Sequence, residues 1–259
     1  MKSHFMVLII VLFGVVIGSC QGGGLRKNFY KKKCPDAEQI IKKATEKRVS
    51  KNPALAAKFL RMHFHDCFVR FQKPLWEVPT GRRDGRVSQN SEALAQIPSP
   101  FSDFKTLAQS YASKGLSVHD LVVLSGGHTI GIGHCNLFSN RLYNFTGKGD
   151  QDPSLNKAYA KFLKTKCRGI SDTTTIVEMD PRSSLNFDNN YYHVLKRNMG
   201  LFQSDAALLT DKKALKSVNE MLNPSKFFKE FAISMQKMGA IGVLTGNAGE
   251  IRNKCSVVN

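Results

Sequence analysis

The chain is poor in acidic residues and lacks long apolar runs. Its 20 Asp and Glu face 38 Lys and Arg, which gives a formal net charge of +18. The longest apolar run, from Phe5 to Gly18, is shorter than the roughly 18 to 20 residues that span a bilayer. Helix-turn-helix, RNA-binding and zinc-finger signatures are missing, which argues against a nucleic-acid partner. The apolar fraction of 42% excludes the disordered and fibrous classes.

The apolar run near the N-terminus is typical of a secretory signal peptide. Lys2 precedes it, and the small residues Gly18, Ser19 and Cys20 follow it. We expect residues 1–20 to be removed and residues 21–259 to form a single secreted domain. The alternative, a short membrane anchor, would need a longer apolar run.

The excess of positive charge predicts a polyanionic neighbour. The mature chain would lose only Lys2 among its charged residues. In an extracellular setting we expect an acidic polysaccharide rather than a nucleic acid. Lys31 to Lys33 is most simply a solvated charge run.

The cysteine count is odd once the signal peptide is removed. Cysteines occur at positions 20, 34, 67, 135, 167 and 255. In an oxidising compartment, an odd number means that at least one thiol stays free, pairs between chains, or has lost its partner.

Helical patterning dominates the mature part, so the expected fold class is mainly α. A first helix is expected from Ala37 to about Arg48. A second has Asn52 as its N-cap, Pro53 as its first helical residue, and Ala54 to Phe68 as good helix formers. Further helices are expected over residues 102–114, 118–124, 155–166, 188–198, 213–222 and 225–238.

Local signals refine these elements. Ser117 and Asp120 form a capping-box pattern before an apolar run that Gly126-Gly127 ends. Between residues 71 and 101 turn residues dominate, which predicts irregular structure with a short strand. The last helix has an apolar stripe made of Phe228, Phe231, Met235 and Met238.

Arg61 and His65 lie four residues apart late on the second helix, so they share a face. Such a pair can handle both a proton and a developing negative charge. A lone histidine is more often a structural core residue, and this interpretation stays open for the segment taken alone. A metal site is a third interpretation, because His63, Asp66 and Cys67 are also potential ligands. Consecutive helical residues diverge by about 100°, however, so these side chains cannot converge on one ion without other ligands.

His128 lies in the segment Ser125-Gly126-Gly127-His128-Thr129-Ile130-Gly131, at the end of a short apolar helix. Glycines at such a position let a flat group approach the backbone. Taken alone, the segment is more typical of a plain helix stop with an incidental histidine.

Together, Arg-x-x-Phe-His-Asp-Cys at residues 61–67 and Ser-Gly-Gly-His-Thr-Ile-Gly at residues 125–131 closely resemble the class III secretory plant peroxidases. The resemblance covers nearly all of residues 21–259. Further matching segments are residues 28–30, 34–35, 79–85, 97–101, 180–192, 203–205 and 251–255. The resemblance implies the plant haem-peroxidase fold, with the haem between a distal and a proximal helix.

The resemblance implies haem b as cofactor and a role for each site residue. His128 would be the axial ligand of the haem iron, with Phe64 and Asp205 as further residues of the haem site. Asp205 is similar to the carboxylate that hydrogen-bonds the axial histidine. His65 would move a proton of hydrogen peroxide, while Arg61 stabilises the charge as the O–O bond breaks.

The implied reaction is oxidation of small phenolic donors by one-electron steps, with Pro98 similar to the family's donor-binding position. Such chemistry serves cell-wall and lignin-type reactions, removal of hydrogen peroxide and the response to oxidative stress. The implied location is extracellular, in the cell wall, or vacuolar. The implied state is a monomer.

The resemblance also implies bound calcium. The matching proximal ligands are Thr129, Asp180, Ser183 and Asp188, with the Asn186 carbonyl as a further donor. Oxygen donors suit this hard cation. A solvated acidic loop is the alternative. Of a second site, only Asp66 and the Val69 carbonyl remain.

Two features fit secretion. Cys135 and Cys167 match a disulfide of the family, and Asn144-Phe145-Thr146 is a sequon for N-glycosylation.

After Arg70 the chain departs from the family. Relatives continue with a stretch that contains two core helices, whereas Phe71-Gln72-Lys73-Pro74 follows here at once. The absent stretch would carry the remaining distal calcium ligands and the asparagine that orients the distal histidine. It would also carry the disulfide partners of Cys34, Cys67 and Cys255, which accounts for the odd count.

We therefore expect an internally truncated haem peroxidase, and two other functions stay open. The first is a catalytically impaired splice-type isoform that acts as a basic, polyanion-binding or haem-binding protein. The second is a secreted metal-binding protein built on His63 and His65.

Overall fold

The computed structural model describes residues 24–66 and 78–259, with the side chains in these ranges except those of residues 62–66, 92 and 93. The predicted signal peptide and the junction between Arg70 and Phe71 lie outside the described residues. None of the helices in the described ranges combines the length and hydropathy that a bilayer crossing needs.

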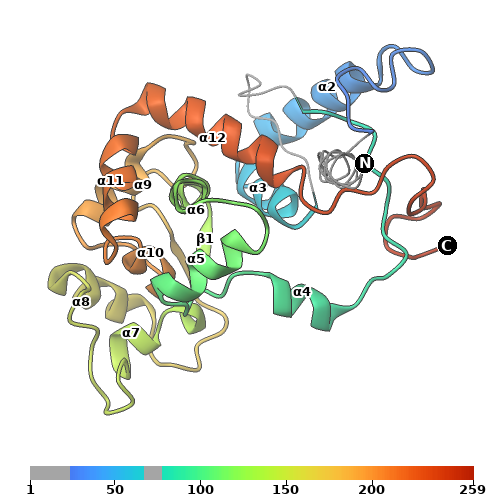
Figure 1. The fold of residues 1–259 in the computed structure, drawn as a ribbon. Coiled ribbons are helices and arrows are strands. Elements are labelled where there is room, and N and C mark those ends of the chain that lie inside the picture. The colour runs from blue at the N-terminus through green and yellow to red at the C-terminus, as the bar shows by residue number, and fades with distance from the viewer. Residues whose placement is uncertain (1–23, 67–77) are drawn as a thin grey trace, which may run out of the picture.

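The described chain is mainly helical, as predicted (Figure 1). The helices are α2 (Ala37–Lys51), α3 (Ala54–Asp66), α4 (Asn90–Gln96), α5 (Phe104–Ala112), α6 (Val118–Ser125), α7 (Asn140–Tyr143), α8 (Lys157–Lys166), α9 (Asn190–Lys196), α10 (Gln203–Ala207), α11 (Lys212–Met221) and α12 (Pro224–Met238), with the 3-10 turns η1 (Gly126–Thr129) and η2 (Cys135–Leu137). Strands β1 (Ile132–His134) and β2 (Ile176–Glu178) pair antiparallel, with Gly133 opposite Val177.

The predicted helices are present, with ends that differ by a few residues. The capping box of Ser117 and Asp120 is formed. Helix α3 begins at Ala54, so Pro53 precedes the helix instead of opening it. The prediction of irregular structure was wrong for residues 90–96, which form α4. This helix was missed because none of its described side chains forms a buried apolar stripe; Leu94 is 71% exposed.

The short strand expected in the same region is replaced by isolated bridges. Thr80 pairs with Arg26, and two residues farther along pair with the C-terminal segment, Arg83 with Leu244 and Asp84 with Glu250. Residues 78–86 therefore tie both ends of the described chain together.

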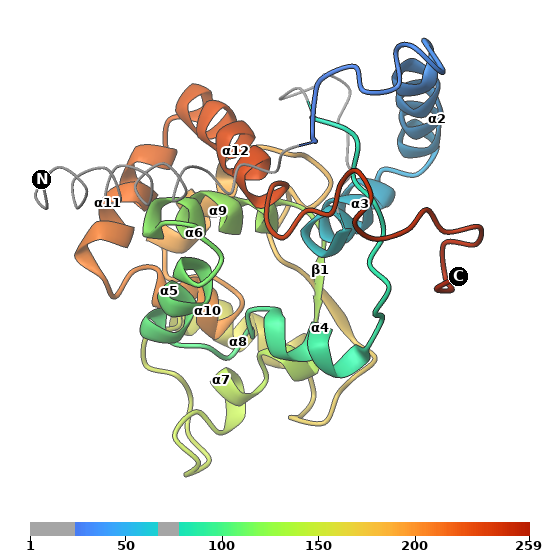
Figure 2. The ribbon, with the colours of Figure 1, turned by 45° about the vertical axis from the view of Figure 1, so that its right-hand side comes forward.

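Helix α6 lies at the centre of the larger hydrophobic cluster. Its residues 120–124 are all buried, and α5, α11 and α12 pack around it (Figures 1 and 2). From α12, the cluster receives Phe227, Phe231 and Met235. The predicted stripe placed Phe228 in this row, but Phe228 is only partly buried and Phe227 takes the inner position.

A second cluster surrounds the disulfide between Cys135 and Cys167, which was predicted from the resemblance. Close to it, the buried Arg141 forms an ion pair of 2.7 Å with Asp152. Its Nη1 also donates to the carbonyls of the three residues before α10, Gly200, Leu201 and Phe202. A buried charge needs such partners. The arrangement holds the segment that leads into α10.

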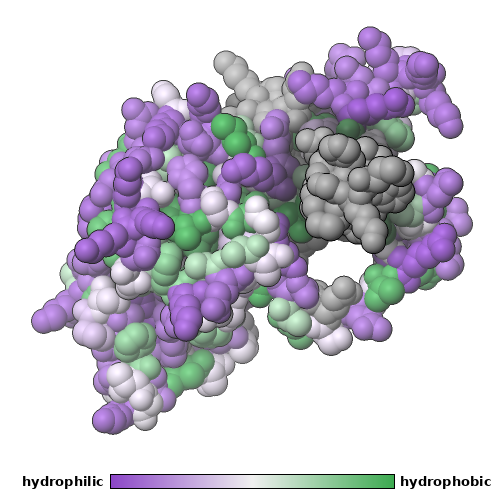
Figure 3. Space-filling model, in the orientation of Figure 1, coloured by the Kyte–Doolittle hydropathy of each residue, from purple (hydrophilic) through white to green (hydrophobic). Residues whose placement is uncertain are grey.

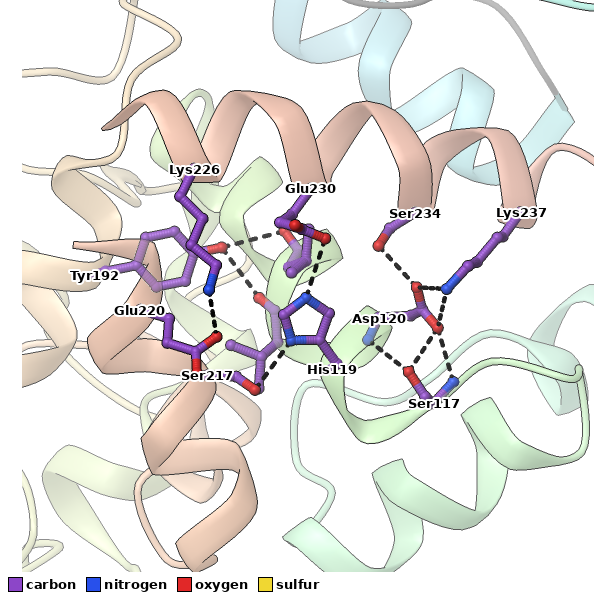
Figure 4. A network of polar contacts seen from close by, with 12 residues as sticks. Ser117, His119, Asp120, Tyr192, Ser217, Glu220, Lys226, Glu230, Ser234 and Lys237 are labelled. Carbon is purple, nitrogen blue, oxygen red and sulfur yellow. Dashed lines mark hydrogen bonds and ion pairs between the residues drawn. The ribbon is translucent and has the colours of Figure 1, made fainter. Parts of the chain in front are cut away.

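A polar network joins α6 to α12 (Figure 4). Ser234 Oγ and Lys237 Nζ, both on α12, donate to Asp120 Oδ1 at 2.8 and 2.9 Å. One turn away, His119 Nε2 lies 3.4 Å from Glu230 Oε2. These contacts fix the start of α6 and thereby the direction in which its far end points.

Helix α2 differs from the others in its position. None of its residues is buried, and both ribbon views place it at the edge of the molecule, away from α6 (Figures 1 and 2). The Glu38 carboxylate ties the helix to the rest by accepting from Thr80 Oγ1 at 3.1 Å, and the partly buried Val49 of α2 packs against the larger cluster.

Candidate functional site

His128 lies where α6 ends and the tight turn η1 begins. This turn requires glycine, because a Cβ at Gly126 would lie 2.4 Å from the Tyr192 hydroxyl and 2.6 Å from the Phe227 ring. A Cβ at Gly127 would lie 3.2 Å from Leu60 of α3. The glycines beside His128 thus let three helices pack closely against the backbone that carries it.

The imidazole of His128 is held by a buried carboxylate. Its Nδ1 lies 2.8 Å from Asp205 Oδ1, and Asp205 is only 2% exposed. The same carboxylate accepts from the Tyr191 hydroxyl at 2.8 Å and from the Phe202 backbone N–H at 2.9 Å. Three donors therefore converge on one buried carboxylate.

The three donors set the charge of Asp205. Burial raises the pKa of this carboxyl, but the interactions with His128, the Phe202 N–H and the Tyr191 hydroxyl outweigh it, so its pKa is lowered. Burial and the charge of Asp205 raise the pKa of Tyr191 well above its usual value, so its hydroxyl remains a donor. An ionised Asp205 assigns the proton to Nδ1 of His128 and leaves the lone pair of Nε2 free.

Two aromatic rings fix the orientation of the imidazole. Tyr191 and Phe202 meet it edge to face, with ring centroids 5.8 and 5.4 Å away. The His128 side chain is nonetheless 36% exposed, and no described group forms a hydrogen bond with Nε2. A neutral imidazole that donates through Nδ1 to a carboxylate is the usual arrangement of a histidine that binds a metal through its other nitrogen.

The helix that carries the Arg61–His65 pair packs against the same turn. Besides Leu60 near Gly127, Ala57 of α3 lies 3.0 Å from the Cβ position of Gly131. Gly131 has a φ of +101°, which favours glycine. Arg61 is exposed. The side chains of Phe64, His65 and Asp66, and all of Val69, lie outside the described part of the chain.

Four residues predicted as calcium ligands lie together around Thr129, the residue that follows His128. Thr129 Oγ1 donates to Asp180 Oδ2 at 3.0 Å and to Asp188 Oδ1 at 2.8 Å. Ser183 Oγ donates to Asp188 Oδ2 at 2.6 Å. The turn is closed by the Asn186 N–H, which donates to the Ser183 carbonyl at 2.8 Å. Oxygen atoms of Thr129 and of the loop 180–188 thus converge.

The electrostatics of this oxygen cluster are unfavourable without a cation. Burial raises the pKa of Asp180 to about 6, and the neighbouring charges of Asp188 and Glu178 act in the same direction, against hydrogen bonds from Asn190 and Thr129. The described residues contain no group of three or more His, Cys, Asp or Glu able to hold a metal. The cluster instead combines two carboxylates with two hydroxyls, the oxygen chemistry that calcium accepts.

Pro98 lies in the loop that joins α4 to α5 and is half-buried. The loop is fastened to the helix of Asp205, because the Ser204 N–H donates to the Pro100 carbonyl at 3.0 Å. Pro98 and the Asp205–His128 pair are therefore positioned by adjacent parts of the chain.

The role of Tyr191 was not anticipated from the sequence. In sequence, Tyr191-Tyr192 is simply part of a segment that matches the family, yet Tyr191 is fully buried between Asp205 and His128. An aromatic pair on a short helix shows no sign of such a contact, because its two partners are 14 and 63 positions away in sequence.

The remaining predicted positions lie at the surface. Asn144 opens the loop after α7, and its side-chain carbonyl accepts from the Gly149 N–H at 2.8 Å. Cys34 and Cys255 are exposed, unpaired thiols in the described ranges. Cys67 lies outside them. Lys31 to Lys33 are exposed, as expected of a solvated charge run.

Comparison with known proteins identifies the family. The family model described as "Peroxidase" matches residues 70–224. Among curated proteins, the chain is 42% identical to Peroxidase 3 of Arabidopsis thaliana over 309 aligned positions, which cover 94% of each chain. It is 43% identical to Peroxidase 56 of the same species over 300 positions, with 91% of each chain covered, and 41% identical to Peroxidase 30 over 322 positions, with 98% of each covered.

These alignments are longer than the chain itself. The alignment with Peroxidase 3 has 309 positions, whereas the chain has 259 residues. At least 50 positions of that relative therefore have no counterpart in this chain. Identity near 40% over nearly the full length, the matching family model and the mainly helical fold agree: the chain is a peroxidase of the plant haem peroxidase family.

Proposed function

We propose that this peroxidase is secreted and uses haem b to oxidise small phenolic donors with hydrogen peroxide, in one-electron steps. The observation that supports this most is the pair of His128 and Asp205. A buried, ionised carboxylate accepts the Nδ1 proton at 2.8 Å and leaves Nε2 of a partly exposed imidazole free to bind iron.

The residues present fit a haem on this side of the molecule. Bound haem would supply the redox-active iron that reacts with peroxide. His128 would hold the iron, with Phe64 as a further contact of the cofactor. Asp205 would increase the basicity of the imidazole, while Tyr191 and Phe202 keep its ring in one orientation.

On the distal side, across the haem site from His128, we assign the proton transfer to His65. It would take a proton from one oxygen of hydrogen peroxide and return it to the oxygen that leaves as water. Arg61, four residues earlier on the same helix, would stabilise negative charge while the O–O bond breaks. Phenolic donors would approach near Pro98, and the products suit cell-wall and lignin-type chemistry, peroxide removal and oxidative-stress responses.

We further propose one calcium ion at the oxygen cluster after His128. Its ligands would be Thr129, Asp180, Ser183 and Asp188, with the Asn186 carbonyl. The support is the convergence of these groups and the raised pKa of Asp180, which a divalent cation would lower again. The second site would be incomplete, with Asp66 and Val69 alone.

The length difference from the relatives supports an internal loss of sequence. We propose that the missing block lies at Arg70 and Phe71. The match to the family model begins at residue 70, next to this junction. The loss would leave Cys34 and Cys255 without their bridges, in agreement with their exposure as free thiols.

We also propose that the mature protein is a monomer in the cell wall or vacuole, glycosylated at Asn144. A second function, binding of acidic polysaccharide by a catalytically impaired isoform, is favoured by the net charge of +18.

One experiment separates them. The mature chain is expressed with haem and calcium, and its absorption spectrum and peroxide-dependent oxidation of a phenol are recorded. An active peroxidase shows a haem spectrum and phenol oxidation that requires peroxide. A haem spectrum without turnover identifies the impaired isoform, and no haem spectrum refutes the proposed haem site.

A further inference from the structure

The two long sides of α2 differ in charge and exposure. The side facing the rest of the molecule holds Glu38 and Glu46, both partly buried. Glu38 accepts from Thr80, and Glu46 forms an ion pair of 3.9 Å with Lys42. The acidic residues of the helix therefore face inward and already have hydrogen-bond or ion-pair partners.

The outer side of α2 is a row of lysines. Lys43, Lys47 and Lys51 are spaced four residues apart, and all three are exposed. On an α-helix this spacing places them on one face with a rise of about 6 Å from each to the next. None of the three forms an ion pair with a described residue. We call these three residues the lysine row.

The surroundings of the lysine row add charge of the same sign. Arg48 is exposed beside it, and Lys31 to Lys33 are exposed in the loop that leads into the helix. This end of the molecule is largely hydrophilic in the space-filling view (Figure 3). Like charges four residues apart destabilise a helix, and a bound polyanion would remove that repulsion.

We propose that the lysine row of α2 is the docking site of a linear, carboxylated polysaccharide. Regularly spaced cations along a straight edge match a polymer that presents a carboxylate at regular intervals. The choice of polysaccharide over nucleic acid rests on the secretion included in the proposed function and on the lack of nucleic-acid-binding motifs. Haem binding and catalysis play no part in it.

The test compares two sets of lysines on different helices. The first variant carries Lys43→Gln, Lys47→Gln and Lys51→Gln. The control carries Lys212→Gln, Lys213→Gln and Lys216→Gln on α11, three exposed lysines with no ion pair to a described residue. Both lose the same charge, and glutamine has nearly the helix propensity of lysine. Circular dichroism confirms equal helix content.

Retention on immobilised polygalacturonate is measured with rising NaCl, without calcium and with or without haem. We expect the α2 variant to bind roughly tenfold more weakly or worse and with a smaller salt dependence, while the α11 control behaves like wild type. Equal weakening of both variants would reduce the effect to net charge and overturn the proposal. So would an unchanged α2 variant.

Two further arms identify the partner and control for folding. Replacing the three α2 lysines by arginine keeps the charge and should preserve retention; its loss would contradict the proposal. Duplex DNA serves as the competing polyanion. If it binds more tightly than polygalacturonate through the same three lysines, the assignment to a polysaccharide is wrong. Because no arm depends on haem, the result is independent of whether the protein turns over peroxide.

Discussion

The proximal part of the molecule, residues 102–238, and the N-terminal part, residues 24–66, are built differently. In the proximal part, residues 120–124 of α6 are all buried and α12 contributes Phe227 and Phe231 at 0 and 1% exposure. In the N-terminal part, α2 buries no residue, and Ile40 is 59% exposed. The proposed haem ligand lies in the well-packed part. The proposed proton-transfer residue lies on α3, which inserts Ala56 and Leu60 into the larger cluster, whereas α2 touches that cluster through the partly buried Val49.

From this difference we infer which of the proposed properties a shortened peroxidase would retain. The proposed binding of haem through His128 would depend on contacts among α6, α9, α10 and α12, which are all present. The proposed peroxide cleavage would also depend on the position of α3, which packs into the larger cluster through Ala56 and Leu60. We therefore expect changes in the two parts to have separable effects.

The largest effect is expected for His65→Ala on the distal side. Loss of a general acid–base residue lowers turnover by roughly 10²- to 10⁴-fold. Haem binding should persist, because the proximal ligand is intact. Steady-state oxidation of a phenol, measured together with the haem spectrum, tests this. Unchanged turnover would remove His65 from the reaction.

Matched truncations compare the packing of the two parts. Phe231→Ala should lower the free energy of unfolding by about 3–5 kcal/mol, because it opens a cavity in the larger cluster. Ile40→Ala on α2 should change it by less than about 0.5 kcal/mol, as is typical of exposed positions. Urea unfolding gives both values. Equal losses would show that α2 belongs to the same cooperative core.

Calcium should stabilise the proximal part through one tight site. At a free calcium concentration of 100 times the Kd, one bound ion raises the free energy of unfolding by about 2.7 kcal/mol. Asp188→Asn should abolish this gain, whereas Asp36→Asn, at an exposed position before α2 with no side-chain capping bond, should preserve it. Calorimetric titration counts the sites. Two sites of similar affinity would mean that the second site is complete.

The ionised state of Asp120 should make a pH-dependent contribution to the free energy of unfolding. Burial opposes it, but hydrogen bonds from Ser117, Lys237 and Ser234 lower the pKa of Asp120 from 3.8 to about 2. The Asp120 carboxyl therefore binds a proton more readily in the unfolded chain than in the folded one. Its contribution to stability is complete above pH 3.8 and is lost as the pH falls toward 2.

Asp120→Asn should therefore cost about 1–3 kcal/mol at neutral pH and flatten the acid limb of the stability curve. Urea midpoints recorded at several pH values between 5 and 2.5 measure both effects. An unchanged acid limb would exclude Asp120 as the group responsible.

The smallest effect on the fold is expected from the thiols. Cys34 and Cys255 are exposed, so they should react with an alkylating reagent in the folded chain, or link two chains, while Cys135 and Cys167 remain protected. Mass spectrometry without reduction distinguishes these forms. A monomer without any reactive thiol would show that the shortened chain has formed a new bridge.

Sequence patterns predicted the longer helices of both parts, and they missed α4, which lies between the two parts. The start of α6 could be recognised from Ser117 and Asp120, because a capping box is a local interaction. Helix α4 could not, because Leu94 is exposed and leaves no amphipathic pattern. The pairing of His128 with Asp205 came from a family resemblance, and no local rule predicts a contact between positions 77 residues apart.

The contact of Tyr191 with Asp205 could not be predicted from sequence patterns. Its hydroxyl reaches Asp205 only because α9 packs beside η1, and this contact is set by tertiary packing. The same holds for Phe227 in the core. The helical stripe predicted Phe228, and the choice between neighbours was decided by the space beneath Gly126.

The central claim is that His128, oriented by Asp205, holds haem in the shortened chain. Haem titration followed by absorption tests it most directly, with wild type, His128→Ala and, as control, His193→Ala at an exposed position of α9. We predict a saturable spectrum of a histidine-ligated haem in wild type and in the control, and its loss in His128→Ala. An identical spectrum and affinity in all three proteins would contradict the account.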